Sequence, residues 1–90
     1  MAIHVRPTLP KTLNSPEHGA FMSVLRDSRR GAGLTQAELA SRLARPQSYI
    51  AKLETGERRM ELVEFILLSR AIGRSPARMI EEVEAKVAER

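Results

Sequence analysis

The sequence predicts an all-α domain of five helices that follows a flexible N-terminal arm. No segment shows the strict alternation of apolar and polar residues that marks a half-buried strand. The apolar residues are mainly Leu, Ala, Ile, Val and Met, most of which are good helix formers. Beyond residue 14, prolines, glycines and helix-capping residues divide the chain into five short segments, and each segment has the length of a helix.

The first helix is expected to begin after Ser15. Ser15 is a suitable N-cap, and Pro16 fits the first helical position because its missing N–H has no partner there in any case. The helix is expected to run to about residue 30 or 32, where two glycines end it. One stripe of this helix carries Phe21, Leu25 and Ser28, so this stripe is expected to face the core.

The second helix carries a complete set of start signals. Thr35 is an N-cap, and Glu38 three residues later completes a capping box. Leu34 and Leu39 flank the cap at the spacing of a hydrophobic staple. We expect this helix to run to about Leu43, with an apolar face that contacts its neighbours.

The third helix is expected to span about residues 47–54. Pro46 prevents one continuous helix, but proline is favoured at the first position of a new one, and Gly56 provides the stop. Ile50 and Leu53 are predicted to face inward. The outer face is then left to four residues: Gln47, Ser48, Ala51 and Lys52.

Two further helices complete the domain. The fourth is expected at about 62–71, with Gly73 as its terminator and a core side made of Leu62, Phe65, Ile66 and Ile72. The fifth begins at a Ser-Pro pair, residues 75–76, and can continue to Ala88 because Met79, Ile80, Val83 and Val87 keep a helical spacing.

Residues 35–54 thus form two short helices joined by a tight turn, with polar side chains at the start of each. This arrangement is typical of a helix-turn-helix, which presents its second helix to the major groove of DNA. The net charge of +4 is consistent with that reading: residues 1–60 hold ten basic and five acidic residues, whereas residues 61–90 hold five and six. Charge alone would not decide the matter, because many proteins without nucleic-acid partners are as basic.

Residues 1–14 contain two prolines and no helical period, so we expect a flexible arm ahead of a helix-turn-helix domain at 15–90. Arg6 and Lys11 could touch the DNA backbone or the minor groove. The alternative is a leader without a role.

Composition limits the class of protein further. With 90 residues, 42% of them hydrophobic, the chain can form one small domain with a buried core. It has no cysteine, which excludes disulfides and thiolate zinc sites and fits a reducing cytoplasm. The longest apolar run, residues 65–68, is far too short to span a membrane. We therefore expect a soluble cytoplasmic protein.

Several stretches resemble a known family: GLTQAELASRL at 33–43, QSYIAKLETGERR at 47–59, and ELVEF and SRAIGRSPARMI beyond them. They are similar to lambda-repressor-like, Cro/Xre-type helix-turn-helix transcriptional regulators, over about residues 20–82. The resemblance implies the five-helix lambda-repressor-like fold, DNA binding and transcription regulation. Two departures are visible. Ala44 replaces the usual turn glycine, at a cost of about 1 kcal/mol if that position is left-handed, and Glu61 replaces a better helix cap.

The resemblance implies roles for two glutamines. Gln36 is expected to contact a phosphate and to brace Gln47, which is expected to read a base edge. A glutamine amide can donate to adenine N7 and accept from N6, so the chemistry agrees with this expectation. The alternative is that both are ordinary solvated residues at helix starts.

Other DNA contacts are expected around the third helix. Ser48 can reach a base or a phosphate, and Lys52 is expected to meet a phosphate. Tyr49 could contact DNA or be partly buried against the fourth helix. Three loop arginines are candidate phosphate clamps, although exposed loop arginines are common: Arg45, Arg58 and Arg59.

The resemblance also implies an internal salt bridge between Arg29 and Glu54. Glu54 ends a helix, where a negative charge is unfavourable, so a structural partner would explain it. Such a pair adds little net stability, but breaking one side would be costly.

An enzyme is not expected. His4 and His18 are the only histidines, and the sequence shows no paired carboxylates, metal-ligand spacing or phosphate-binding loop. We interpret His18 as a surface residue of the first helix. No cofactor, metal or small-molecule effector is expected, since 90 residues leave no room for a separate ligand domain.

Two functions remain. The first is a sequence-specific regulator, expected to act as a repressor. It would bind a palindromic operator in double-stranded DNA as a homodimer, because one such domain alone reads too few base pairs. Its two-fold interface is expected at Ile80, Val83 and Val87 with part of the fourth helix. The second is an antitoxin or adaptor that acts mainly through a toxin or another protein partner.

Overall fold

The computed structural model describes residues 15–89, and it is built of helices with no strand in that range. The five helices are α1 (Pro16–Gly31), α2 (Gln36–Arg42), α3 (Gln47–Thr55), α4 (Leu62–Ile72) and α5 (Pro76–Ala88). The predicted fold class and element order are therefore confirmed. The predicted arm, with Arg6 and Lys11, lies outside the described residues.

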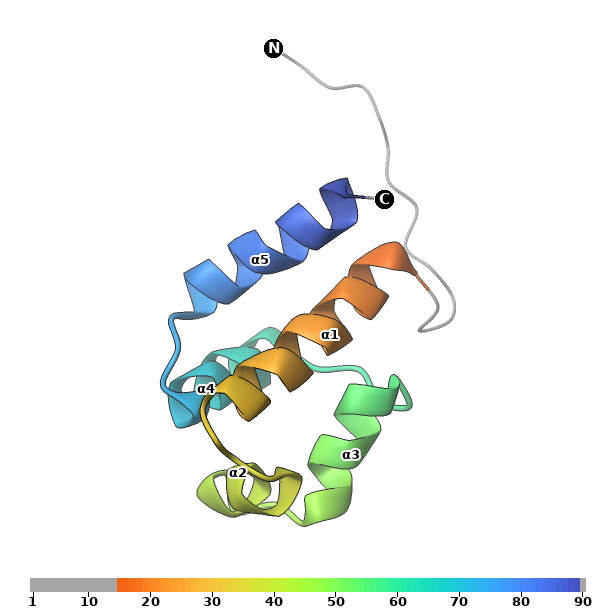
Figure 1. The fold of residues 1–90 in the computed structure, drawn as a ribbon. Helices are drawn as coiled ribbons and strands as arrows, with labels where there is room; N and C mark the ends of the chain where they lie inside the picture. Colours follow the sequence, from red (N-terminus) through yellow and green to blue (C-terminus); the bar gives the residue numbers. More distant parts are fainter. Residues whose placement is uncertain (1–14, 90) are drawn as a thin grey trace.

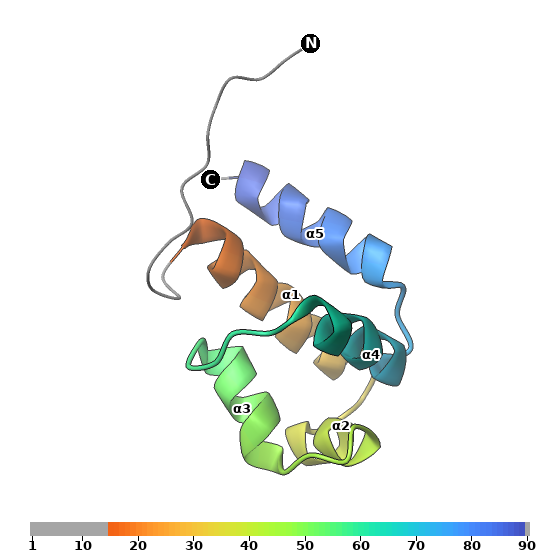
Figure 2. The same ribbon diagram turned by 180° about the vertical axis from the view of Figure 1, so that it is seen from behind.

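The long helix α1 organises the domain. In both ribbon views α5 runs along one side of α1, while α2 and α3 lie on the other side (Figures 1 and 2). α2 and α3 pack against each other, and α4 contacts both α2 and α5. The helix-turn-helix unit thus lies on the side of α1 opposite α5.

The helix starts follow the local signals in the sequence. The Ser15 hydroxyl accepts a hydrogen bond from the His18 N–H at 3.0 Å. The Thr35 hydroxyl accepts from the Glu38 N–H at 3.0 Å, and the Glu38 carboxylate accepts from the Thr35 N–H at 2.9 Å. This reciprocal pair is the predicted capping box. These caps satisfy N–H groups that the helices cannot satisfy internally.

The turn between α2 and α3 contains the backbone strain that was expected at Ala44. Ala44 has a φ of 54°, in the left-handed region that glycine favours, so the backbone is strained there by crowding of the Ala44 Cβ. The strained turn is held by a hydrogen bond from the Arg45 N–H to the Ala40 carbonyl oxygen at 2.9 Å. Pro46 is the N-cap of α3, so the helix begins at Gln47, the residue at which it was predicted to start. Its ψ of 157° is extended, which keeps Pro46 itself outside the helix.

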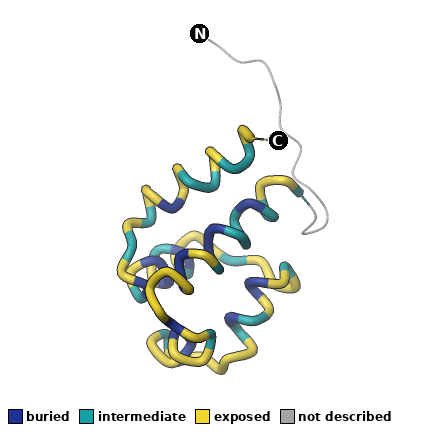
Figure 3. Tube along the Cα trace, in the orientation of Figure 1, coloured by how far each residue is buried: buried dark blue, intermediate teal, exposed yellow. Residues whose placement is uncertain are grey.

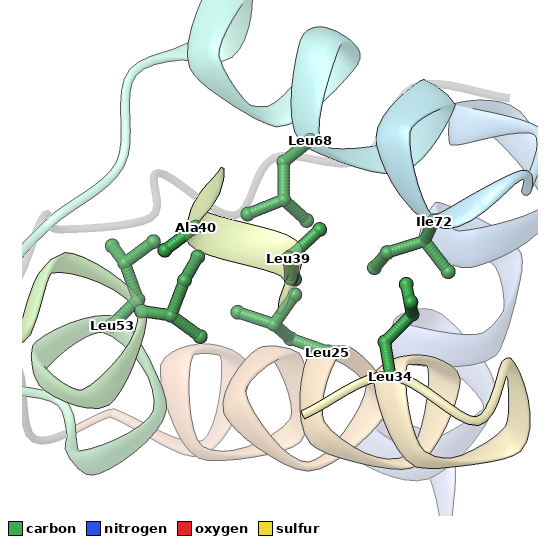
Figure 4. Close-up of a cluster of buried hydrophobic side chains, with 8 residues drawn as sticks. Leu25, Leu34, Leu39, Ala40, Leu53, Leu68 and Ile72 are labelled. Atoms are coloured by element: carbon green, nitrogen blue, oxygen red, sulfur yellow. The ribbon is translucent and has the colours of Figure 1, made fainter. Parts of the chain in front are cut away.

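The main core lies where α1, α2, α3 and α4 meet (Figure 4). Buried positions gather where helices face one another, and the tip of the α2–α3 unit is largely exposed (Figure 3). Ala40 is only 1% exposed, and its small side chain lets α3 pack closely against α2. The cluster comprises Leu25, Leu34, Leu39, Ala40, Ile50, Leu53, Leu68 and Ile72.

A smaller cluster joins α1, α4 and α5. Its buried members are Val24, Phe65 and Met79, and the rings of Phe21 and Phe65 meet edge to face at 5.7 Å between centroids. Val83 of α5 packs against this cluster. Part of the stripe predicted to form a dimer interface therefore serves the core of the domain itself.

One core assignment was wrong. Leu62 is 68% exposed, although its spacing from Phe65 predicted an inward position. Leu62 is the first residue of α4, whereas Leu68, later in the same helix, is 0% exposed and belongs to the main core. Ile66 is only partly buried. No helix of residues 15–89 has the length and apolar character needed to cross a membrane.

Candidate nucleic-acid interface

One face of α3 is polar and exposed to solvent. Gln47, Ser48 and Lys52 are exposed there, while Ile50 and Leu53 on the inner side are 0% and 1% exposed. This separation anchors the helix through its apolar side and leaves its polar side free to enter a groove. Arg45 is exposed in the turn just ahead of α3.

The structure brings the two predicted glutamines together. The side-chain amide of Gln47 donates through Nε2 to Gln36 Oε1 at 2.6 Å. The brace that the family resemblance implied is therefore present before any DNA is bound. Because one end of the amide is held, Gln47 loses less side-chain entropy when it contacts a base.

The predicted pair of Arg29 and Glu54 is buried and bidentate. Arg29 Nε lies 2.6 Å from Glu54 Oε2, and Nη2 lies 3.0 Å from Oε1. The two side chains are 8% and 4% exposed. A third guanidinium nitrogen, Nη1, donates to the Leu34 carbonyl oxygen at 2.8 Å, which ties the start of the α2 segment to the same group.

Both members of the Arg29–Glu54 pair are ionised at neutral pH. Burial raises the pKa of Glu54, but hydrogen bonds from Arg29 and Gln36, with the charges of Arg29 and Arg26, outweigh burial and lower the pKa below its ordinary value. The hydrogen bond to Glu54 raises the pKa of Arg29 against the opposing effect of burial. Glu54 is therefore a carboxylate at neutral pH, with acceptor oxygens only.

Gln36 has a second partner that the sequence did not predict. Its Nε2 donates to Glu54 Oε1 at 3.0 Å. Gln36 is 18 residues from Glu54 in the chain, so no local spacing rule could have indicated the contact. The amide of Gln36 therefore lies between a buried carboxylate and the exposed Gln47.

Tyr49 is partly buried on α3, which is the second of the two alternatives left open by the sequence. Its hydroxyl donates to Glu64 Oε2 of α4 at 3.1 Å, and burial with this contact raises its pKa. The guanidinium of Arg58 lies 4.8 Å from the centre of the Tyr49 ring. Arg58 also lies 3.2 Å from Glu64 Oε2 through Nη1.

Glu64 is thus a residue that the sequence analysis missed. Its carboxylate accepts from the Glu61 N–H at 2.9 Å, and this hydrogen bond is the main cause of a pKa below the ordinary value. The signal was present, since an acidic residue three positions after a helix cap is half of a capping box. Glu64 contacts Tyr49 in the first turn of α3 and Arg58 in the loop after α3. A phosphate contact by Arg58 would therefore have to compete with this ion pair.

The remaining arginine of the loop between α3 and α4 lies beside a cleft. Arg59 lines a cleft of about 450 Å³ together with residues of α1, α4 and α5. His18 also lines it, and burial with the charge of Arg59 lowers the His18 pKa. His18 is partly buried, so the prediction of a plain surface residue was wrong. Within residues 15–89, no group of three or more His, Asp or Glu is placed to hold a metal ion.

These features define a Cro/Xre-type helix-turn-helix regulator, and comparisons with known proteins agree. The family model of the helix-turn-helix domain matches residues 21–81, and the chain belongs to this family. The matched range runs from α1 into α5 and contains every element of the candidate interface. No curated protein matches the chain.

Solved structures show the same relationship. An XRE-family like protein from Pseudomonas syringae pv. tomato str. DC3000 is 42% identical, with 77% of this chain and 84% of that chain covered and a TM-score of 0.72. Two structures of the clp gene regulator ClgR from Corynebacterium glutamicum are 25% and 26% identical, with TM-scores of 0.73 and 0.75. They cover 79% and 81% of this chain and 91% and 78% of those chains.

Proposed function

We propose that this protein is a transcriptional repressor that reads operator DNA with α3 in the major groove. The observation that carries the proposal is the exposed amide of Gln47, which Gln36 holds at the first residue of α3. The start of a recognition helix lies nearest the base edges in this class of protein. Occupation of an operator blocks other proteins from the same DNA, which is the physical basis of repression.

Base readout is tested by Gln47→Ala. On a duplex selected from a random pool by the wild-type protein, we expect discrimination at one or two base pairs to fall by about 1–3 kcal/mol, the usual contribution of one bidentate contact. Competition binding against duplexes with single base-pair changes measures this. An unchanged preference at every position would refute readout by Gln47.

Phosphate contacts are proposed for Lys52 and Arg45, and for Arg58 and Arg59 at the edge of the interface. Ser48 lies beside Gln47 and can serve a base or a phosphate. Lys52→Ala should weaken binding to all sequences alike and reduce the salt slope by about one unit. Arg70→Ala is the matched control, because Arg70 is exposed on α4, outside the proposed interface. Equal slopes for wild type and Lys52→Ala would argue against the phosphate role.

We also propose that the protein binds a two-fold operator as a homodimer. The large exposed apolar residues suggest the interface: Leu62 and Val63 at the start of α4 are 68% and 65% exposed, and Ile80 of α5 is 47% exposed. Leu62 and Ile80 line the same cleft, so they lie on one face of the domain. We therefore propose an interface at the start of α4 with Ile80, since Val83 already packs against the core of the domain.

The dimer is tested by changing the exposed residues. The double variant Leu62→Glu with Ile80→Glu should keep the fold and lose the two-to-one complex with a palindromic duplex in a stoichiometric titration. Ala85→Glu is the control, because Ala85 is exposed on another side of α5. A double variant that keeps wild-type stoichiometry and affinity would contradict this interface. The alternative adaptor role gains no specific support, because the exposed side chains of α3 are those that suit DNA.

A further inference from the structure

A continuous chain of hydrogen bonds runs from the core to the exposed start of α3. Arg29 donates twice to Glu54, at 2.6 and 3.0 Å. Gln36 Nε2 donates to Glu54 Oε1 at 3.0 Å, and Gln47 Nε2 donates to Gln36 Oε1 at 2.6 Å. The chain begins in α1, passes the end of α3 and the start of α2, and finishes at the start of α3.

Gln47 and Glu54 cannot contact each other directly. They are seven residues apart on α3, which places them about 10 Å apart along the helix axis. Two helical turns bring them to nearly the same face, and the Gln36 side chain spans the gap between them from α2. Gln36 therefore links Glu54, near the end of α3, to Gln47 at the start of the same helix.

The chemistry of the partners decides which way each amide points. An ionised carboxylate only accepts hydrogen bonds, so Gln36 must turn its NH2 group toward Glu54. The carbonyl oxygen of Gln36 then faces Gln47, so Gln47 must donate a hydrogen bond to it from its own NH2 group. Rotation of either amide by half a turn would set oxygen against oxygen, and this is the physical reason for a single orientation.

We propose that Glu54 is a positioning residue for base readout, because its carboxylate fixes the amide orientation of Gln36 and, through it, that of Gln47. The inference rests on the proposed readout by Gln47. With one N–H held by Gln36, Gln47 offers its second N–H and then its oxygen in a fixed order across the groove. That order matches adenine N7 followed by N6 in one direction only, so it distinguishes A·T from T·A.

The experiment separates this role from a purely structural one. The double variant Arg29→Met with Glu54→Leu replaces the buried ion pair by two apolar side chains. Proteins often keep their stability when a buried ion pair is replaced in this way. Arg74→Met with Glu82→Leu is the matched control. It removes a second bidentate Arg–Glu pair that has no contact with Gln36 or Gln47 among the described residues.

The measurement is competition binding on a duplex selected by the wild-type protein, with each base pair changed in turn. At the base pair whose preference Gln47→Ala abolishes, we expect the Arg29–Glu54 double variant to lose about fivefold or more in discrimination, the lower end of a bidentate contact. Discrimination at the other base pairs should stay as in the wild type. The Arg74–Glu82 control should retain discrimination at every position.

Gln36→Met provides a second variant in which the buried ion pair, and with it the fold, is kept. It should lose discrimination at the same base pair, and it decides the outcome if the double variant does not fold. Wild-type discrimination in Gln36→Met, or in a folded double variant, would overturn the role of Glu54 while leaving readout by Gln47 intact. If Gln47→Ala itself changes no base preference, the proposed readout is wrong and the inference falls with it.

Discussion

The two sides of α1 each hold an Arg–Glu ion pair, and the pairs differ in burial and in reach. Arg29 and Glu54 join α1 to α3, with side chains 8% and 4% exposed. Arg74 and Glu82 join the α4–α5 turn to α5, with side chains 29% and 44% exposed. Arg74 also donates to the Ser28 hydroxyl of α1 at 3.0 Å. A bidentate Arg–Glu pair can therefore be compared in the core and near solvent within one domain.

The difference shows what burial adds. Water screens the Arg74–Glu82 pair, so its contribution to stability is small. The Arg29–Glu54 pair is largely shielded from solvent, and Glu54 also accepts a hydrogen bond from Gln36. The buried pair can therefore constrain the exposed side chain of Gln47 through Gln36. An exposed pair cannot act in this way, because its own two side chains are free to rearrange in solvent.

The largest effect is expected from Arg29→Ala. It leaves a buried carboxylate with Gln36 as its remaining partner, and we expect the free energy of unfolding to fall by about 3–5 kcal/mol. Denaturant melts measure the loss. Arg29→Met with Glu54→Leu should recover much of it, and equal losses in the single and double variants would show that the two residues are not coupled.

A smaller change of opposite sign is expected in the turn. Ala44→Gly should raise the free energy of unfolding by about 0.5–1 kcal/mol, because relief of the left-handed strain exceeds the added flexibility of glycine in the unfolded chain. Ala32→Gly is the control, since Ala32 has a φ of −84° and should lose stability instead. Stabilisation of both variants, or of neither, in thermal melts would show that the sign of φ does not govern the effect.

Arg74→Ala tests the exposed side of the comparison. Its loss of stability should be at most about 1 kcal/mol, because water solvates Glu82 when the arginine is removed. Added salt should shrink the difference from wild type, whereas the effect of Arg29→Ala should be far less sensitive to salt. A loss as large as that of Arg29→Ala would mean that partial exposure does not weaken this pair.

The smallest effect concerns pH. Burial and the charge of Arg59 lower the His18 pKa in the folded protein, whereas the unfolded chain keeps a value of about 6.5. Below 6.5 the unfolded chain takes up a proton that the folded protein does not, so stability falls as pH decreases toward the folded pKa. Melts of His18→Leu between pH 7 and pH 5 should show a shallower decrease, and slopes equal to those of the wild type would contradict the shift.

Most of the helix boundaries could be predicted because their causes are local. Ser15, Thr35 and Ser75 cap helices through hydrogen bonds to N–H groups three residues away, and Gly56 and Gly73 end helices because they accept a positive φ. Each of these interactions depends on neighbours in the chain. Pro46 precedes α3, which begins at Gln47 as its sequence predicted.

The candidate site divides in the same way. The exposed face of α3 followed from helical period, and the Gln36–Gln47 and Arg29–Glu54 contacts followed from resemblance to the family. Their joining through Gln36 and Glu54 did not, and neither did the contacts of Glu64 with Tyr49 and Arg58. These contacts link residues of different helices, and helix crossing angles decide whether the side chains meet.

The sequence by itself determined the five helices, the polar face of α3 and the class of protein, because caps, helical period and motif spacing act over a few residues. Only the tertiary structure decided that Leu62 is exposed while Leu68 is buried, and that Val83 serves the core. Only the tertiary structure showed that the Glu54 carboxylate accepts hydrogen bonds from both Arg29 and Gln36. Burial and long-range hydrogen bonds depend on how helices pack, and that packing is a property of the whole domain.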